Sequence, residues 1–155
     1  MLEKIISGGQ TGVDRAALDV ALEFGIACGG SCPAGRTADD GPIPEKYPLT
    51  ETSDYDHLVR TGNNVKDSDG SMLLYRDKLH GGTAYAMQMA KHMSREVMAI
   101  DLQKSPDPQV VVDWINRHSI HTLHIGGQRE KTSPGIYQQA HTYIQKVVVL
   151  LQRGE

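Results

Sequence analysis

The chain has 155 residues, about the length of one domain, of which 39% are hydrophobic and 23% charged. This composition excludes a disordered or collagen-like chain and predicts one folded, ligand-binding domain over residues 1–155. The formal net charge of −3, without a long run of lysine or arginine, argues against nucleic acid or a membrane surface as a partner. No apolar run reaches the ~18 residues of a membrane span, and no signal-peptide pattern opens the chain, so we expect a cytoplasmic protein.

Hydrophobic periodicity predicts short strands that alternate with amphipathic helices along the whole chain. The first helix is expected to be capped by Thr11 and to end at Gly25. The second should begin at Ser53 or Asp54, and the last at Ser133-Pro134. Two further helices are predicted from Gly81 to Met93 and from Asp107-Pro108 onward, and strands are predicted at about residues 3–7, 26–28, 71–75, 97–101 and 122–125.

Strands that alternate with helices are typical of an α/β fold with a parallel sheet, because each parallel crossover needs a helix to cover the sheet. We therefore predict a three-layer α/β domain with about five strands, with the first strand in the middle of the sheet. The ligand crevice should lie at the carboxyl ends of the strands. The segment 29–52 holds four of the seven prolines and is predicted to be a long functional loop without regular structure.

Paired glycines stand at three of the predicted strand-to-helix junctions: Gly8-Gly9, Gly81-Gly82 and Gly126-Gly127. Glycine permits close approach of the backbone to a ligand, and the N–H groups at the start of each following helix favour an anion. The three junctions therefore predict a site for a small phosphate-bearing molecule. The simpler alternative is that these glycines only form tight turns.

The motifs of common nucleotide-binding enzymes are absent from these junctions. The run GGQTG at residues 8–12 lacks the Gly-x-Gly-x-x-Gly spacing of dinucleotide dehydrogenases, and no Gly-Lys-Ser/Thr of a P-loop occurs. Arginines near the glycines suit a phosphate because guanidinium binds it with two parallel hydrogen bonds. The candidates are Arg15, Arg36 and Arg129, joined by the carboxylates Asp14 and Glu130, although Asp14 could equally stabilise the helix dipole.

Potential metal ligands occur, but none forms a persuasive set, and we expect no metal site. Cys28 and Cys32 form a single pair, which is a weak zinc signal. The acidic pairs at 39–40 and 67–69 are more typical of turns than of magnesium sites. His118, His121 and His124 run from a helix end into a strand, which would send their side chains to different faces.

Several motifs resemble those of the molybdenum cofactor carrier family: ISGGQTGVDRAALD at 6–19, CPAGR at 32–36, DGPIP at 40–44, NVxDSD at 64–69, GGT at 81–83 and PGIY at 134–137. The resemblance implies a Rossmann-like fold related to the lysine-decarboxylase-like or "lonely guy" proteins, and a homo-oligomer. It also implies that the chain carries molybdenum cofactor, a pterin with a phosphate tail and a dithiolene-bound metal. The contact residues that it implies are Gly9, Gln10, Thr11, Gly12, Arg15, Gly82, Thr83 and Arg129.

The chain departs from its enzymatic relatives at one telling position. Related nucleotide phosphoribohydrolases carry a catalytic glutamate three residues after the GGxGT motif, whereas Ala86 stands at the corresponding place here. An alanine cannot transfer a proton, so we expect no catalytic residue. Two alternatives stay open: a nucleotide-sugar enzyme that uses Glu130 or Asp14, and a nucleotide-binding sensor. Gln128 and Lys131 also depart from the family pattern, in the last glycine-rich loop.

Overall fold

The computed structural model describes residues 1–154, which form an α/β structure around a parallel sheet of five strands. The strands lie in the order β2-β1-β9-β7-β8, and each pairs with its neighbours in parallel. The predicted fold class is therefore confirmed. The five strands are β1 (Lys4–Ile6), β2 (Ala27–Gly29), β7 (Gly70–Tyr75), β8 (Glu96–Asp101) and β9 (Thr122–Gly127).

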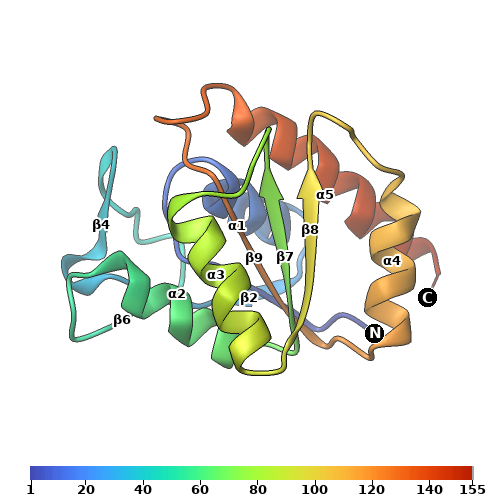
Figure 1. Ribbon diagram of the computed structural model, residues 1–155, viewed down its shortest axis with the longest axis horizontal. Coiled ribbons are helices and arrows are strands. Elements are labelled where there is room, and N and C mark those ends of the chain that lie inside the picture. The colour runs from blue at the N-terminus through green and yellow to red at the C-terminus, as the bar shows by residue number, and fades with distance from the viewer. Residues whose placement is uncertain (155) are drawn as a thin grey trace.

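Helices cover both faces of this sheet, as the three-layer prediction requires (Figure 1). On one face α1 (Val13–Glu23) and α4 (Pro108–Arg117) both pack against α5 (Ile136–Arg153). On the other face α2 (His57–Lys66) packs against α3 (Gly81–His92). No helix within residues 1–154 is long and apolar enough to cross a membrane.

The two faces of the sheet bury hydrophobic clusters of different size. The larger cluster joins α1, α4 and α5 to residues such as Ile5, Leu74 and Ile125, all at most 1% exposed. Under α2 and α3 the buried hydrophobic cluster contains only Val65, Leu73, Ala86 and Ala90. Small alanine side chains on α3 thus leave more space on this second face, at the end where the strands stop.

The order of the strands differs from the prediction, because β9 and not β1 lies in the middle of the sheet. If the β9–α5 unit is counted first, the sheet acquires the 3-2-1-4-5 order of a doubly wound fold. The chain ends are compatible with such a rearrangement, since Met1 and Gln152 line the same surface hollow and both termini lie at one side in Figure 1. The topology is therefore compatible with a circular permutation of a doubly wound fold.

Three predicted helix starts are wrong in detail, whereas Gly25 ends α1 as predicted, with a φ of +69°. Gly12 and not Thr11 is the N-cap of α1, and it gives no side-chain cap. The N-cap of α2 is Asp56, whose carboxylate accepts from the Leu58 N–H at 2.9 Å, so Ser53 and Asp54 lie before the helix. The last helix starts at Ile136, behind a left-handed Gly135, rather than at Ser133-Pro134.

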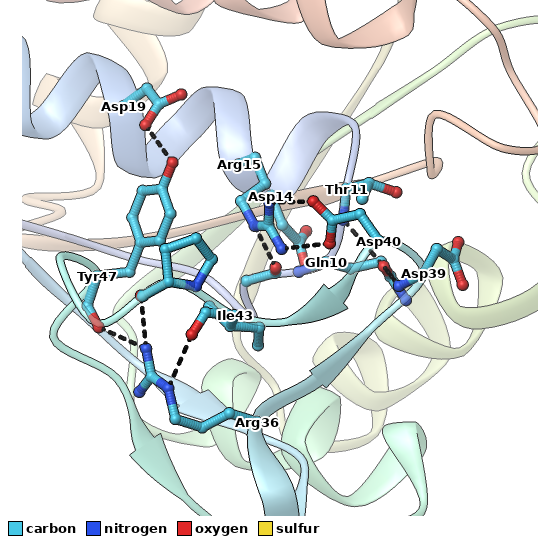
Figure 2. A network of polar contacts seen from close by, with 12 residues as sticks. Gln10, Thr11, Asp14, Arg15, Asp19, Arg36, Asp39, Asp40, Ile43 and Tyr47 are labelled. Carbon is cyan, nitrogen blue, oxygen red and sulfur yellow. Dashed lines mark hydrogen bonds and ion pairs between the residues drawn. The ribbon is translucent and has the colours of Figure 1, made fainter.

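The segment 29–52 is structured, contrary to the prediction of a loop without regular elements. It contains β3 (Ser31–Cys32), the 3-10 turn η1 (Ala34–Arg36), β4 (Thr37–Ala38), β5 (Gly41–Pro42) and β6 (Thr50–Glu51). β4 and β5 pair as an antiparallel hairpin, here called the 37–42 hairpin. Side chains help to hold this segment in place. The carboxylate of Asp19 on α1 accepts hydrogen bonds from the hydroxyls of Tyr47 and Tyr137, and Figure 2 shows the bond from Tyr47.

Candidate ligand-binding site

A cavity of about 280 Å³ opens at the carboxyl ends of β7 and β9, on the face covered by α2 and α3. Residues from the loops after β1, β7 and β9 line it, so the three glycine-rich junctions meet as the sequence predicted. Eight of the predicted residues contribute to the wall: Gln10, Asp14, Gly81, Gly82, Thr83, Gly126, Gly127 and Arg129. The remaining candidates do not line it: Gly8, Gly9, Thr11, Gly12, Arg15, Arg36 and Glu130.

The first turn of α3 presents bare backbone to the cavity. A Cβ built on Gly81 or Gly82 would meet no atom within 4 Å, so nothing separates the backbone there from the open space. The N-cap residue, His80, forms no side-chain cap. Because the first N–H groups of a helix have no partner within the helix, Gly81, Gly82 and Thr83 offer donors and a positive dipole end to an anion.

Arg60 on α2 supplies a largely buried cation in the same cavity, and it lies outside the motifs from which the site was predicted. Its side chain is only 12% exposed, and its Nη1 lies 3.5 Å from Oδ2 of Asp14. Its Nε is buried and has no hydrogen-bond acceptor within residues 1–154. Gly8 makes this placement possible, since a Cβ at that position would collide with the Arg60 guanidinium. Gly8 thus leaves room for Arg60 and does not itself line the cavity.

Two further titratable groups line the cavity beside Arg60. Burial raises the pKa of Asp14 above its usual range, although Arg60 and the Gln10 N–H act in the opposite direction. Burial and the nearby charge of Arg60 lower the pKa of His124 to about 3. His124 is therefore a neutral imidazole at physiological pH, and its Nδ1 lies 2.8 Å from the Ser71 hydroxyl.

Arg15 faces the 37–42 hairpin rather than the cavity (Figure 2). Its Nε donates to the Gly9 carbonyl at 2.7 Å, and its two terminal nitrogens bind the Asp40 carboxylate at 2.9 Å each. These hydrogen bonds hold the pKa of Asp40 below its usual range. Arg36 is likewise committed, because its guanidinium donates to main-chain carbonyls of Ile43, Leu49, Pro44 and Tyr47. Both arginines hold the 29–52 segment together.

Arg129 lies where the 37–42 hairpin meets the cavity. Its Nη1 is 3.1 Å from Oδ1 of Asp39, and the Asp39 N–H donates to the side-chain oxygen of Gln10 at 2.9 Å. The carboxylate of Asp39 therefore forms an ion pair with an arginine that lines the cavity. An incoming phosphate would compete with this carboxylate for the same guanidinium.

We expect Asp39→Asn to raise the affinity for a phosphate-bearing ligand by up to about fivefold, since exposed ion pairs contribute about 0.2–1 kcal/mol. Isothermal titration calorimetry against the wild type checks this. Asp40→Asn is the control from the same hairpin, because its arginine does not line the cavity. Equal gains in both variants would show that hairpin mobility, and not competition for Arg129, limits binding.

Glu130 stabilises the start of α5 and does not face the cavity. Its carboxylate accepts hydrogen bonds from the N–H groups of Gly135 and Tyr137, and these bonds lower its pKa. The neighbouring Gln128 fixes the same loop: its Oε1 accepts from the Arg76 N–H at 2.9 Å, and its Nε2 donates to the Lys78 carbonyl at 3.2 Å. These bonds explain how the loop with Gln128 and Lys131, in place of the family residues, keeps a defined shape.

Loss of the Glu130 cap should destabilise the fold. Glu130→Ala is expected to cost about 1 kcal/mol, as for other helix caps, and to lower the melting temperature by about 2–4 °C. Because the folded-state pKa is depressed, this stability is present above the unfolded pKa and is lost as pH falls through the folded pKa. Thermal melts at pH 7 and pH 3 should therefore differ less in Glu130→Ala and Glu130→Gln than in the wild type. A pH-independent deficit would contradict the capping role.

Comparison with known proteins agrees with the topology. The model of the "Circularly permutated YpsA SLOG family" matches residues 5–148. The chain belongs to this family. The strand order described above agrees with this description, because counting the β9–α5 unit first gives a doubly wound order.

One solved structure is similar to the chain in both sequence and fold. It is a protein from Syntrophus aciditrophicus named "Putative molybdenum carrier protein", 38% identical, with a TM-score of 0.91 over 95% of each chain. The search of curated proteins gives no match. The resemblance to molybdenum cofactor carriers that the motifs indicated is thus confirmed at the level of the family and the fold.

Proposed function

We propose that this protein binds a phosphate-bearing small molecule in the cavity between α2 and α3, and that its cargo is molybdenum cofactor. The observation that carries the proposal is the buried guanidinium of Arg60, whose Nε has no acceptor within residues 1–154, in the same cavity as the open first turn of α3. A buried donor without a partner is costly, and a phosphate oxygen would satisfy it.

The groups around the cavity suit a phosphate in both charge and hydrogen bonding. Arg60 and Arg129 contribute positive charge, while Gly81, Gly82 and Thr83 contribute backbone donors. Asp14 is the one carboxylate among the lining residues described. Helix N-termini and arginines together form a common anion-binding arrangement, so a ligand with a terminal phosphate is favoured over a neutral one.

The side chains of the cavity fit a protein that carries its ligand better than an enzyme that converts it. Ala86 is 2% exposed and lines the cavity, so a methyl group occupies the place of the glutamate of related phosphoribohydrolases. Glu130, the alternative acid, is used to cap α5. The Syntrophus protein with the same fold also bears the name of a carrier.

The residues and the size of the cavity fit one end of molybdenum cofactor. At about 280 Å³ the cavity lies just below the ~300–1,000 Å³ usual for enclosed small-ligand pockets. The phosphate end would bind inside, and the remainder would extend toward the mouth beneath the 37–42 hairpin. Neither Cys28 nor Cys32 lines the cavity, so the dithiolene of the cargo would meet no protein thiolate there.

Self-association is a second part of the proposal. Near the start of α2 stands a group of exposed large hydrophobic residues close in sequence, Tyr55, Leu58 and Val59, of which Leu58 lines the cavity. Such a group favours contact with another protein surface, and we propose a second copy of this chain, as the family resemblance implies. Light scattering after size-exclusion chromatography should give a mass above 17.0 kDa. A monomer at all concentrations would contradict this.

Titration calorimetry under argon tests the proposed function. The wild type should bind molybdopterin with micromolar or tighter affinity, in competition with inorganic pyrophosphate. Binding of adenosine monophosphate but not of molybdopterin would favour a nucleotide sensor instead. Absence of binding to any of the three would contradict a phosphate site.

A further inference from the structure

We propose that the protein has a second ligand site, which binds a small organic carboxylate with an apolar chain through Arg76 and Tyr143. The site is a pocket of about 390 Å³ between the start of α5 and the loop that leads from β8 into α4, here called the α4–α5 pocket. It lies on the side of the sheet that α4 and α5 cover, away from α2 and α3 (Figure 1). The residues that line it are all different from those of the α2–α3 cavity, so the inference is independent of the proposed function.

Tyr143 on α5 brings a buried hydroxyl without a partner to this pocket. The residue is 5% exposed, and its hydroxyl forms no hydrogen bond within residues 1–154. Burial and the charge of Asp107 raise the pKa of Tyr143 to about 12, so the hydroxyl keeps its proton. Since Asp107 stands in the chain between Pro106 and Pro108, which line the pocket, the hydroxyl lies toward that end of it. A buried donor without an acceptor is costly, and an oxygen of a ligand would satisfy it.

Arg76, the first residue after β7, is fixed in place with one terminal nitrogen free. Its Nε donates to the side-chain oxygen of Gln139 and its Nη1 to the Pro134 carbonyl, both at 2.7 Å. The side chain of Gln128 bonds to both the N–H and the carbonyl of Arg76, so the backbone is fixed as well. In the described part of the chain Nη2 forms no such bond. A guanidinium held in this way loses little conformational freedom when it binds an anion.

The charges around the α4–α5 pocket favour an anion. Arg76 and Lys146 are its charged lining residues, and no carboxylate lines it among residues 1–154. The carboxylate of Asp107 is occupied as the N-cap of α4, where it accepts from the Gln109 N–H at 2.9 Å. A ligand with one negative charge would therefore meet two cations and the Tyr143 hydroxyl.

The number of donors favours a carboxylate over a phosphate. The start of α4 offers few free N–H groups, because Pro108 at its first position has none and the Gln109 N–H is bound to Asp107. The pocket differs in this respect from the open first turn of α3. Its two donors with restricted positions, Nη2 of Arg76 and the Tyr143 hydroxyl, match the two oxygens of one carboxylate.

An apolar pocket of about 470 Å³ continues the site along α5. Pro108, Thr142 and Lys146 line both pockets, whereas Val149 and Leu150 line only the second. A ligand whose carboxylate binds in the first pocket would extend its chain over Val149 and Leu150. Burial of that chain adds to the affinity in proportion to the apolar area covered.

An NMR titration of the full-length, ¹⁵N-labelled protein with hexanoate tests this site. The backbone amide signals of Ser105 and Gly135, which line the pocket, should shift and saturate at millimolar hexanoate. Inorganic pyrophosphate, the probe of the α2–α3 cavity, should not displace it. Acetate, which lacks the chain, should bind more weakly. Hexanamide keeps the chain without the charge, and its affinity should be lower by about 10-fold or more.

Tyr143→Phe separates a role in binding from a role in folding. The variant should bind hexanoate about 10-fold more weakly, as expected for a hydrogen bond to a charged group, while its melting temperature should not fall, because the hydroxyl has no partner to lose. Tyr75→Phe is the matched control, since Tyr75 does not line the pocket, and it should bind like the wild type. Arg76→Met should weaken binding at least as much as Tyr143→Phe.

Four results would overturn the inference. Unchanged hexanoate affinity in Tyr143→Phe, or a lower melting temperature, would show that the hydroxyl is not a ligand donor. Equal affinities for hexanoate and hexanamide would show an apolar groove without an anion site. Equal affinities for hexanoate and inorganic phosphate would contradict the carboxylate preference. Displacement by pyrophosphate, or the absence of saturable shifts at Ser105 and Gly135, would remove the second site and leave the proposed function standing.

Discussion

Gly82→Glu is expected to lower ligand affinity by at least about 100-fold, because placing like charges together costs several kcal/mol. The same substitution should make the protein more stable. Gly82 lies in the first turn of α3, and nothing lies within 4 Å of a Cβ built there. A side chain can therefore begin there without a clash, and the new carboxylate would lie beside the cavity that Gly82 lines and repel the phosphate.

The same substitution favours the helix. An acidic residue near a helix N-terminus stabilises it by about 0.3–1 kcal/mol, and replacement of glycine adds to the gain. The melting temperature should rise by about 2–4 °C for each 1 kcal/mol in a chain of this length. Gly82→Gln is the matched control: it has the same size and no charge, so it should lose less affinity. Unaltered binding in Gly82→Glu would place the phosphate elsewhere.

Replacement of Arg60 by methionine should weaken phosphate binding by about 10- to 100-fold, the range expected for charge-assisted hydrogen bonds of about 1.5–3 kcal/mol. Methionine keeps much of the apolar stem of this side chain but removes the guanidinium that packs on Gly8, with its unpaired Nε. The affinity of Arg60→Lys should lie between those of the wild type and Arg60→Met, since lysine keeps the charge and loses the planar donor fork.

Controls separate this effect from net charge and from folding. Arg95 donates to the Lys66 carbonyl and does not line the cavity, so Arg95→Met should bind like the wild type. Arg60→Met leaves Asp14 buried without its cation, which will raise the pKa of Asp14 further. Binding at pH 6 and pH 8 therefore accompanies the titration. Full affinity in Arg60→Met at both values would refute its role as the phosphate ligand.

The sequence predicted the elements and the meeting of the glycine-rich junctions because both depend on local patterns. Alternating periodicity indicates βα units, and the carboxyl ends of parallel strands necessarily share one edge. Gly82 and Arg129, two of the predicted ligand contacts, both line the cavity for this reason. Strand order was not predictable in the same way, because each βα unit looks alike in sequence whichever place it takes in the sheet.

The positions of Arg15 and Arg60 depend on contacts with residues distant in the sequence, so sequence motifs did not predict them. Arg15 follows the first glycine run directly, yet its guanidinium is held by Asp40, which lies on a hairpin 25 residues away. Arg60 stands far from any glycine pair, and only the packing of α2 over Gly8 brings it to the cavity. The buried polar residues Thr61 and Asn64 show that this helix turns polar side chains into the fold, but their burial is visible only in the structure.

Two of the three mispredicted helix starts, those of α5 and α1, are determined by contacts outside the adjacent residues. Glu130 caps α5 from six residues before its first residue, Ile136. Gly12 begins α1 without a side-chain cap, because a Cβ there would collide with the backbone of the 128–130 loop. Both cases depend on tertiary contacts with that loop, which local propensity does not encode.

Native mass spectrometry of wild type and Gly82→Glu, purified side by side without oxygen from a host that makes molybdenum cofactor, tests the central claim most directly. The wild type should retain a phosphate-bearing pterin mass that the variant lacks. The same mass on both proteins, or a wild type that stays empty and takes up neither molybdopterin nor a nucleotide, would contradict a phosphate site at the start of α3.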